Sequence, residues 1–221
     1  MSRRLFIETV IRCDLDTLWH RTQDPAQHQR WDLRFTRIHY LPRPDPGQPQ
    51  RFRYTVRVLP GLTVSGVGST VAERGNRDGC RTSVLRFASA DPLSLIQSGA
   101  GYWRYLPTEA GIRFWTGYDY RPGWGRAGPV ADLLFRPLMR WGTAWSFDRL
   151  RLWLERGVTP ERSLRNALLD AGGRLVVCAI VGFEGSIARA VIAGAALAVL
   201  PPLPTTPAAR RCRTTARSTV E

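Results

Sequence analysis

Lysine is absent from this chain, and so are several common functional signatures. The three histidines and four cysteines form no HExxH, HxxxH or CxxC motif, so neither a metal site nor a disulfide framework is expected. The sequence also has no GxSxG elbow and no glycine-rich loop in a strand–turn–helix context. We therefore predict no metal, no cofactor and no hydrolase triad.

A secretion signal is also lacking at the N-terminus. The first ten residues, MSRRLFIETV, contain no apolar core and no small-residue cleavage site, and they lead directly into a predicted strand. Together with the scattered cysteines, this predicts a cytoplasmic location for the N-terminal domain.

The formal net charge of +14 is carried by arginine alone. Such a charge is typical of nucleic-acid-binding proteins. In the segment RFRYTVRV at 51–58, however, arginines alternate with apolar residues, so they share one face of a strand. No helix-turn-helix, zinc-finger or RNA-recognition signature accompanies them. We therefore expect a solvated basic sheet face and no nucleic-acid partner.

What the sequence does contain is a regular series of strand-like segments around a pair of short helices. Asp14 and the Asp24-Pro25 pair are the N-caps expected of the two helices. Turns or short loops join the other segments, which favours an antiparallel sheet over a βαβ fold. Seven strands are predicted, at about 4–12, 33–41, 51–59, 62–73, 80–88, 93–106 and 112–121.

A long amphipathic helix is predicted from about 127 to 156. Its apolar stripe recurs at i, i+4, i+7 and i+11, and consists of Leu134, Leu138, Trp141 and Trp145. Pro137 is expected to kink this helix or to delay its regular start, and Gly157 to end it. A helix of this length can lie across a curved sheet and cover a cavity.

This order of elements resembles the START-like (SRPBCC) superfamily, which has the helix-grip fold of polyketide cyclase/dehydrase-like and lipid-transfer proteins. The resemblance is carried by the segments LDTLW at 15–19, TQDP at 22–25 and RW at 30–31, and by the long helix. It covers about residues 3 to 158. It implies an α+β fold with a seven-stranded antiparallel sheet, two short helices after the first strand, a long helix over the sheet and an apolar C-terminal extension.

The same resemblance implies a hydrophobic cavity between the sheet and the long helix, and a small hydrophobic ligand such as a lipid, a polyketide-like molecule or an aromatic metabolite. Close packing in the core is the alternative use of any one aromatic ring. No catalytic residue is assigned, so cyclase or dehydratase chemistry and a non-catalytic carrier or membrane-associated accessory module stay open as alternatives. The residues expected to line the cavity are Tyr54, Trp103, Phe114, Thr116, Tyr118, Tyr120, Leu138, Trp141 and Trp145.

The region after the long helix has a different composition. Residues 1–158 are assigned to the ligand-binding domain, 159–174 to a linker, turn or short helix, 175–204 to an apolar helical segment and 205–221 to a disordered basic tail. The apolar segment is long enough to cross a bilayer, but Glu184 and Arg189 interrupt it at a cost similar to the apolar gain. It can span a membrane, lie at its surface or dock on the core, so membrane contact through 175–204 is left open.

Overall fold

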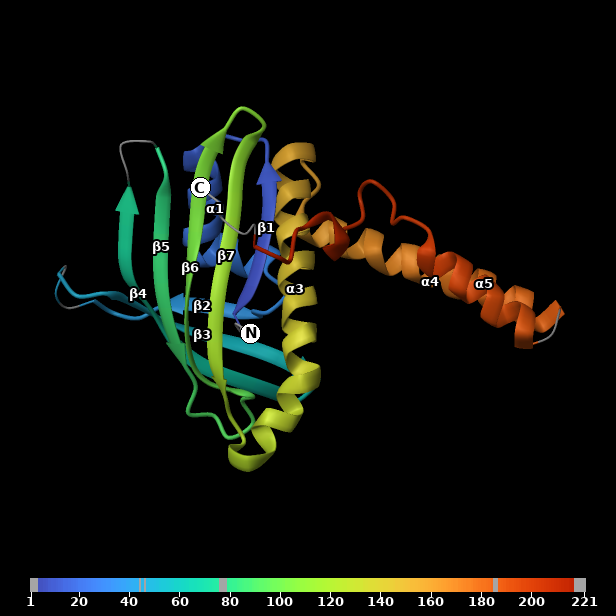
Figure 1. The fold of residues 1–221 in the computed structure, drawn as a ribbon, viewed down its shortest axis with the longest axis horizontal. Helices are drawn as coiled ribbons and strands as arrows, with labels where there is room; N and C mark the ends of the chain where they lie inside the picture. The colour runs from blue at the N-terminus through green and yellow to red at the C-terminus, as the bar shows by residue number, and fades with distance from the viewer. Residues whose placement is uncertain (1–3, 44, 46, 76–78, 185–186, 217–221) are drawn as a thin grey trace.

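A single curved sheet organises the N-terminal three quarters of the chain in the computed structural model, whose described residues are 4–43, 45, 47–75, 79–184 and 187–216. All neighbouring strands are antiparallel, in the order β1-β7-β6-β5-β4-β3-β2 (Figure 1). The strands are β1 (Leu5–Ile11), β2 (Arg37–Tyr40), β3 (Gln50–Leu59), β4 (Leu62–Gly75), β5 (Arg81–Ala88), β6 (Ile96–Thr108) and β7 (Gly111–Pro122). The predicted antiparallel sheet is therefore confirmed.

The start of β2 differs from the prediction, which placed a strand at 33–41. The chain instead makes a turn at Asp32, whose backbone carbonyl accepts the Phe35 amide at 3.1 Å and whose carboxylate accepts the Arg34 amide at 3.1 Å. These local bonds replace the strand ladder until Arg37. The shorter strand matters because the turn places the Asp32 and Arg34 side chains beside each other.

Two short helices follow β1, as predicted. They are α1 (Leu15–Gln23) and α2 (Pro25–Trp31). The Asp14 carboxylate accepts the Thr17 amide at 2.7 Å and so caps α1. Asp24 caps α2 in the same way, with proline at the first helical position.

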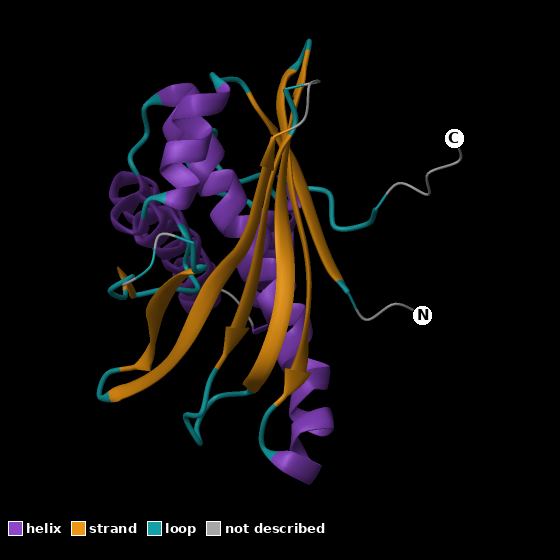
Figure 2. Ribbon diagram, turned by 90° about the vertical axis from the view of Figure 1, so that its left-hand side faces the viewer, coloured by secondary structure: helices purple, strands orange, loops and turns teal. Residues whose placement is uncertain are grey.

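The long helix α3 (Gly128–Arg156) runs along the curved sheet, as Figure 2 shows. It is continuous through Pro137 and ends at Gly157, which has a left-handed φ of 63°. Its C-terminal half packs on the core, where Phe147 stacks on Phe114 at 4.5 Å between ring centroids. Phe114 in turn stacks on Tyr105 at 4.9 Å. These rings fill the space between α3 and the half of the sheet next to α1 and α2.

Two further helices, α4 (Pro160–Glu184) and α5 (Ile187–Val199), form a hairpin that projects away from the sheet (Figure 1). The prediction of a linker, turn or short helix at 159–174 is wrong, because these residues are the first half of the long helix α4. After its first residue, Pro160, α4 contains no proline that would break the helix.

The end of the chain returns to the domain, which corrects the prediction of a disordered tail over 205–221. The short helix η2 (Ala209–Arg211) packs on α3, and the Ala208 amide donates to the buried Asp148 carboxylate at 2.8 Å. Arg213 and Glu8 exchange backbone hydrogen bonds of 2.8 and 2.9 Å. Residues 217–221 lie outside the described residues.

Candidate ligand-binding site

The sheet face turned toward α3, here called the inner face, has glycines beneath aromatic rings. A Cβ on Gly66 would overlap the Tyr54 ring, and a Cβ on Gly99 would overlap the Phe87 ring. The rings can lie across the neighbouring strand because glycine leaves the backbone uncovered there. The result is a largely aromatic floor on the part of the inner face nearest the start of α3.

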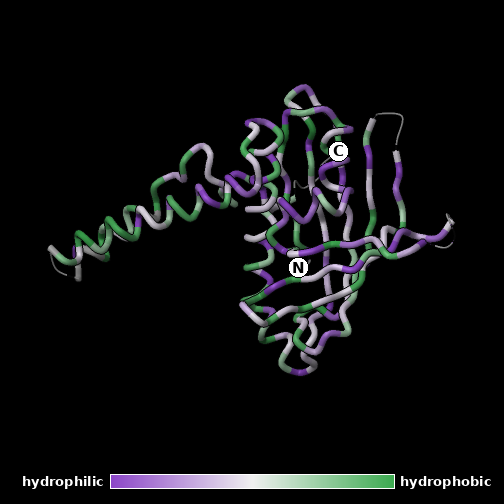
Figure 3. The backbone as a smooth tube through the Cα atoms, turned by 180° about the vertical axis from the view of Figure 1, so that it is seen from behind, coloured by the Kyte–Doolittle hydropathy of each residue, from purple (hydrophilic) through white to green (hydrophobic). Residues whose placement is uncertain are grey.

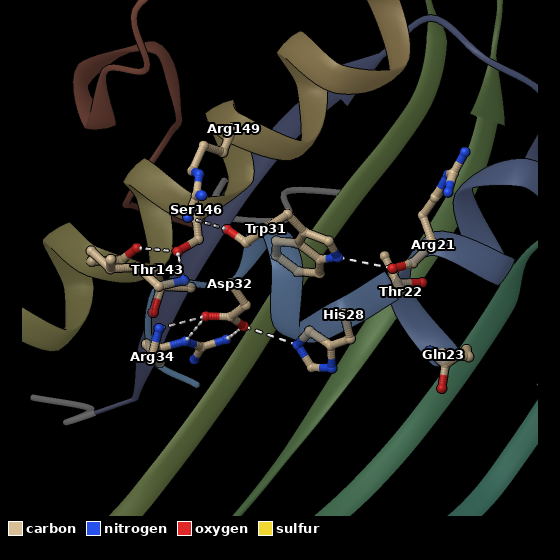
Figure 4. A network of polar contacts seen from close by, with 12 residues as sticks. Arg21, Thr22, Gln23, His28, Trp31, Asp32, Arg34, Thr143, Ser146 and Arg149 are labelled. Atoms are coloured by element: carbon tan, nitrogen blue, oxygen red, sulfur yellow. Dashed lines mark hydrogen bonds and ion pairs between the residues drawn. The ribbon is translucent and has the colours of Figure 1, made fainter. Parts of the chain in front are cut away.

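A polar group of side chains lies beside this floor, and Figure 4 shows three of its members, His28, Asp32 and Arg34. Together with Tyr118, whose ring lies beside Arg34, we call them the Arg34 cluster. Asp32 caps the C-terminal end of α2, so its side chain turns back toward His28 one helical turn earlier. Its Oδ2 lies 3.0 Å from His28 Nε2. Arg34 donates from Nε to Oδ1 at 2.9 Å and from Nη2 to Oδ2 at 2.6 Å.

Burial and pairing set the charges of this cluster. Burial alone would raise the pKa of the Asp32 carboxyl, but the charge and hydrogen bonds of Arg34 hold that pKa well below its usual range. Burial also lowers the pKa of His28, against the opposing effect of Asp32, so the imidazole is neutral at neutral pH. Because an ionised carboxylate only accepts, Nε2 of His28 carries the proton and Nδ1 carries the lone pair.

The cluster is enclosed by aromatic rings but is not sealed. The His28 ring stacks on Trp31 at 4.9 Å between centroids and meets the edge of Trp103 at 4.9 Å. The Arg34 guanidinium lies 5.5 Å from the centroid of the Tyr118 ring. The side chains of His28 and Arg34 are each 14% exposed, whereas that of Asp32 is fully buried. The Arg34 guanidinium thus keeps a small exposed area while it is paired with a fully buried carboxylate.

The predicted hydroxyl groups differ in whether they already have a partner. Thr143 donates to the Met139 carbonyl at 2.7 Å, so at 2.9 Å it accepts its bond from the Tyr118 hydroxyl. Tyr120 donates to Asp132 at 2.6 Å, and both burial and this bond raise the Tyr120 pKa. Each of these hydroxyls is therefore already engaged.

Two further hydroxyls complete this set. Thr116 donates to the Tyr102 carbonyl at 2.9 Å. No hydrogen bond of the Tyr54 hydroxyl is found within the described part of the chain, and burial raises its pKa to about 12. Of the four predicted hydroxyl groups, that of Tyr54 is thus the one available to a ligand in its protonated, donating form.

The predicted aromatic and apolar lining residues fall into three places. Phe114 is fully buried and Trp103 is 6% exposed, and both belong to the packed core. Trp145 is 8% exposed and stacks on Trp141 with centroids 6.3 Å apart. Leu138 and Trp141 are 59% and 50% exposed. The structure thus brings Tyr54, Tyr118 and Trp103 close to the Arg34 cluster but leaves Leu138 and Trp141 at the surface.

The surface position of Leu138 and Trp141 follows from which face of α3 meets the sheet. That contact is made by Asp132, Phe135 and Thr143, which touch Tyr120 or Tyr118, and by Phe147, which stacks on Phe114. At about 100° per residue, Leu138 and Trp141 fall on another face of the helix. The apolar stripe therefore did not mark the sheet-facing side.

Sequence reasoning missed His28, Asp32 and Arg34 as site residues. A local signal was present, because His28 and Asp32 are spaced i, i+4 at the end of a capped helix and Arg34 follows two residues later. The burial of this group under α3 depends on the tertiary fold, and the sequence pattern does not contain it.

Two hollows lie at the end of the sheet where α3 begins. One, of about 560 Å³, is bordered by the β5–β6 loop and the β7–α3 connection, including Asp91, Arg121 and Trp124. The other, of about 540 Å³, lies at the β3–β4 turn around Leu59 and Pro60. In an antiparallel meander these connections share one end of the sheet. Neither hollow is the enclosed space under α3 that the resemblance implied.

Known proteins similar to this chain include one protein of high sequence identity. No protein-family model matches the chain. It is 46% identical over 170 residues to the Bacillus subtilis (strain 168) protein named "Uncharacterized membrane protein YndG", a match that covers 76% of this chain and 63% of that protein. The chain thus spans less than two thirds of the length of this relative.

Two solved structures are similar to this chain at low sequence identity. The di-domain ARO/CYC StfQ from the steffimycin biosynthetic pathway has a TM-score of 0.53 at 14% identity, over 70% of this chain and 50% of StfQ. A STAR-related lipid transfer protein from Xanthomonas axonopodis has a TM-score of 0.49 at 17% identity, over 66% of this chain and 82% of that protein.

The element order and the StfQ comparison lead to one assignment of the fold. Two short helices follow β1, a seven-stranded antiparallel sheet comes next, and α3 crosses it. At 14% identity the similarity establishes this fold and leaves the ligand and the activity open. The chain therefore has the helix-grip fold, as its sequence predicted.

Proposed function

We propose that the domain binds a small hydrophobic molecule that carries one acidic or oxyanionic group, and that Arg34 holds this group. The observation that supports the proposal is a guanidinium, 14% exposed, set among aromatic rings on the inner face. Asp32 occupies Nε and Nη2, which leaves the Nη1 amino group for Tyr118 and for a ligand. In such surroundings an attraction between opposite charges is stronger than in water.

The apolar part of the ligand is expected to lie on the aromatic floor. Phe35 meets Tyr54 at 5.6 Å between ring centroids, and the glycines beneath Tyr54 and Phe87 keep the floor flat. Flat rings favour stacking with an aromatic ligand or contact with an acyl chain. The lone hydroxyl on this floor, that of Tyr54, supplies a second polar contact.

The approach to the floor is expected at the end of the sheet where α3 begins. Val58 and Leu59, at the β3–β4 turn, are 55% and 60% exposed. On α3, Leu138 is 59% exposed. Apolar side chains at an entrance favour the transfer of an apolar ligand from a surface or a carrier. This supports the carrier alternative as much as the enzymatic one.

A catalytic function has one specific observation in its favour, which is the pairing of His28 with Asp32. Asp32 orients the neutral imidazole, whose Nδ1 lone pair can accept a proton. Arg34 can stabilise the oxyanion that such a proton transfer leaves on the ligand. A cyclase or dehydratase requires a step of this kind, whereas a carrier requires only the binding contacts.

The proposal is tested with anilinonaphthalene sulfonate, an apolar fluorophore that carries an anion, and with Nile red, a neutral one. We expect the double variant Asp32→Asn/Arg34→Gln to bind the sulfonate at least about tenfold more weakly and to bind Nile red unchanged. The double change removes both charges, so it leaves no unpaired charge in the core. Equal affinity of both proteins for the sulfonate would exclude Arg34 as the anion site.

A matched control neutralises a surface pair of the same kind. Arg30 donates to Glu161 at 2.9 and 3.1 Å, and the side chains are 37% and 59% exposed. The variant Arg30→Gln/Glu161→Gln should bind both fluorophores like the wild type. If a ligand and a product are identified, His28→Gln separates the two functions, because lost turnover with retained binding indicates an enzyme.

A further inference from the structure

The α4–α5 hairpin turns large apolar side chains outward. Phe183 is 94% exposed, Leu175 69% and Val199 76%. Among the described residues, α4 is long and apolar enough over Pro160–Phe183 to cross a membrane, and none of its most apolar stretch is buried. Figure 3 shows the outer part of the hairpin as mostly hydrophobic. The core helix of a soluble protein can be as long and as apolar as α4, but such a helix is mostly buried, whereas α4 is exposed.

The contact between the two helices includes small residues. An added Cβ on Gly194 would lie 3.8 Å from Cys178 Sγ, so the helices approach closely there. Half-buried positions along the hairpin include Gly182 and Ala193, together with the larger Val181 and Leu197. In water, a helical hairpin would bury its large apolar side chains and expose its small ones. A glycine at the helix contact and many large apolar residues outside are the arrangement found in lipid.

The hairpin contains an internal ion pair. Asp170 Oδ2 accepts Arg174 Nε at 3.0 Å. The Arg174 guanidinium also donates to the carbonyls of Leu197, Leu200 and Pro201, at the C-terminal end of α5. These carbonyls have no helical partner of their own. An internal ion pair that also caps a helix end reduces the cost of placing both in a medium without water.

The base of the hairpin, by contrast, is basic. Arg156, Arg162, Arg165 and Arg210 are exposed there. Arg156 donates to the Pro204 carbonyl at 3.1 Å, and Arg210 donates to the Leu200 carbonyl at 3.2 Å. Guanidinium groups at the base of an apolar projection are complementary to anionic lipid headgroups.

Both ends of the hairpin are fixed to the domain. At the start of α4, Arg149 donates to the Pro160 carbonyl at 2.8 Å. After α5, Arg211 pairs with the buried Asp148 carboxylate at 2.9 Å. The hairpin is therefore held at two points, and whatever binds it also fixes the orientation of the sheet.

We propose that the α4–α5 hairpin inserts into an anionic lipid bilayer, with its large apolar side chains among the acyl chains and its basal arginines at the headgroups. At about 1.5 Å per residue, the helix rises about 28 Å from Arg165 to Glu184, close to the hydrocarbon thickness of about 30 Å. The hairpin is the membrane anchor of the helix-grip domain.

Flotation of the full chain with lipid vesicles tests the proposal. We expect the protein to float with vesicles of phosphatidylcholine and phosphatidylglycerol, and to stay with them at about 1 M salt, where charges beyond about 3 Å are screened. Pure phosphatidylcholine vesicles should capture less protein at low salt. A wild-type protein that stays at the bottom of the gradient with both vesicle types would overturn the proposal.

Two matched double variants test whether flotation depends on the hairpin or on any exposed apolar side chains. Val191→Asn/Ile192→Asn alters hairpin residues that are 64% and 68% exposed, and we expect at least about a tenfold loss of flotation. Val130→Asn/Leu133→Asn alters α3 residues that are 69% and 73% exposed and should float like the wild type. Because all four side chains are exposed, neither variant should unfold the domain, which circular dichroism checks.

A second copy of the chain is the rival occupant of the same surface. Light scattering without lipid or detergent distinguishes it. A discrete dimer that Val191→Asn/Ile192→Asn converts to monomer, combined with no flotation, would assign the hairpin to self-association and overturn insertion. Equal flotation of the two double variants would overturn it as well. None of these outcomes depends on anion binding at Arg34, so the two proposals fail independently.

Discussion

The helix-grip domain and the α4–α5 hairpin use the same apolar residue types in opposite directions. In the domain, Phe114 is fully buried. In the hairpin, Phe183 is 94% exposed, and Gly194 lies at the helix contact instead. The domain thus has the arrangement that water imposes, and the hairpin has the arrangement expected of a segment that is not surrounded by water.

The two regions also differ in how they use an Asp–Arg pair. Asp32 and Arg34 lie beside aromatic rings at the inner face, where Asp32 binds Nε and Nη2 of the guanidinium. Asp170 and Arg174 lie along the hairpin, where the guanidinium caps the end of α5. The first pair is suited to ligand recognition, and the second is suited to holding α4 against the end of α5.

The largest contrast is expected from removing one phenyl ring in each region. Phe114→Ala should lower the free energy of unfolding by about 3–5 kcal/mol, because it leaves a cavity between Tyr105 and Phe147. Phe183→Ala should change it by less than about 0.5 kcal/mol in water. Urea denaturation followed by tryptophan fluorescence measures both. Similar losses would show that the hairpin tip is packed on protein in solution.

Breaking the two ion pairs should give the next contrast. Asp32→Ala leaves the Arg34 charge buried without its partner and should cost about 3 kcal/mol of unfolding free energy. Asp170→Ala, on the more exposed hairpin, should cost less than about 1 kcal/mol in water. The measurement is again urea denaturation, at neutral pH. A larger loss of unfolding free energy for Asp170→Ala than for Asp32→Ala would contradict the view that Asp32–Arg34 is the more buried of the two ion pairs.

The pH dependence of folding stability should also show the Asp32–Arg34 ion pair. The folded-state pKa of Asp32 is lowered below its ordinary value of 3.8, so the stabilisation is fully present above that pH and is lost as the pH falls below it. We expect the wild type to lose stability more steeply than Asp32→Asn/Arg34→Gln below about pH 4. Thermal unfolding over a pH series measures this difference. Parallel curves would indicate that Asp32 has an ordinary pKa.

Glycine replacements should give the smallest contrast. A Cβ on Gly66 would meet the Tyr54 ring and the Ala88 carbonyl, so Gly66→Ala should cost about 1–3 kcal/mol. Around Gly173 in α4, no described atom lies within 4 Å of the added Cβ. Gly173→Ala should therefore stabilise the helix by up to about 1 kcal/mol. Thermal unfolding measures both changes, and a destabilising Gly173→Ala would point to a close neighbour of α4.

The order of the elements could be predicted from the sequence because its signals are local. The caps at Asp14 and Asp24 bond to amides two or three residues away, and both are observed. The start of β2 was misplaced because the Asp32 turn competes with the strand ladder. The tail was misjudged because its order depends on Asp148, about 60 residues earlier in the chain.

The candidate site was harder to predict than the fold. The sheet-facing side of α3 carries polar residues such as Asp132 and Thr143, which Tyr120 and Tyr118 satisfy. Its apolar stripe is largely exposed instead, as Leu138 and Trp141 show. Apolar periodicity finds a buried face only when the partner surface is apolar as well. The tyrosine hydroxyls that satisfy the polar side come from a different element, and no local pattern reveals them.

Native mass spectrometry of the full chain, released from mild detergent, tests ligand binding at Arg34 and also identifies the ligand class by mass. We expect one small apolar molecule with an acidic group per wild-type chain, and none on Asp32→Asn/Arg34→Gln. A wild-type chain that carries only the polypeptide mass and does not bind anilinonaphthalene sulfonate, or a ligand equally bound by both proteins, would contradict the proposed site.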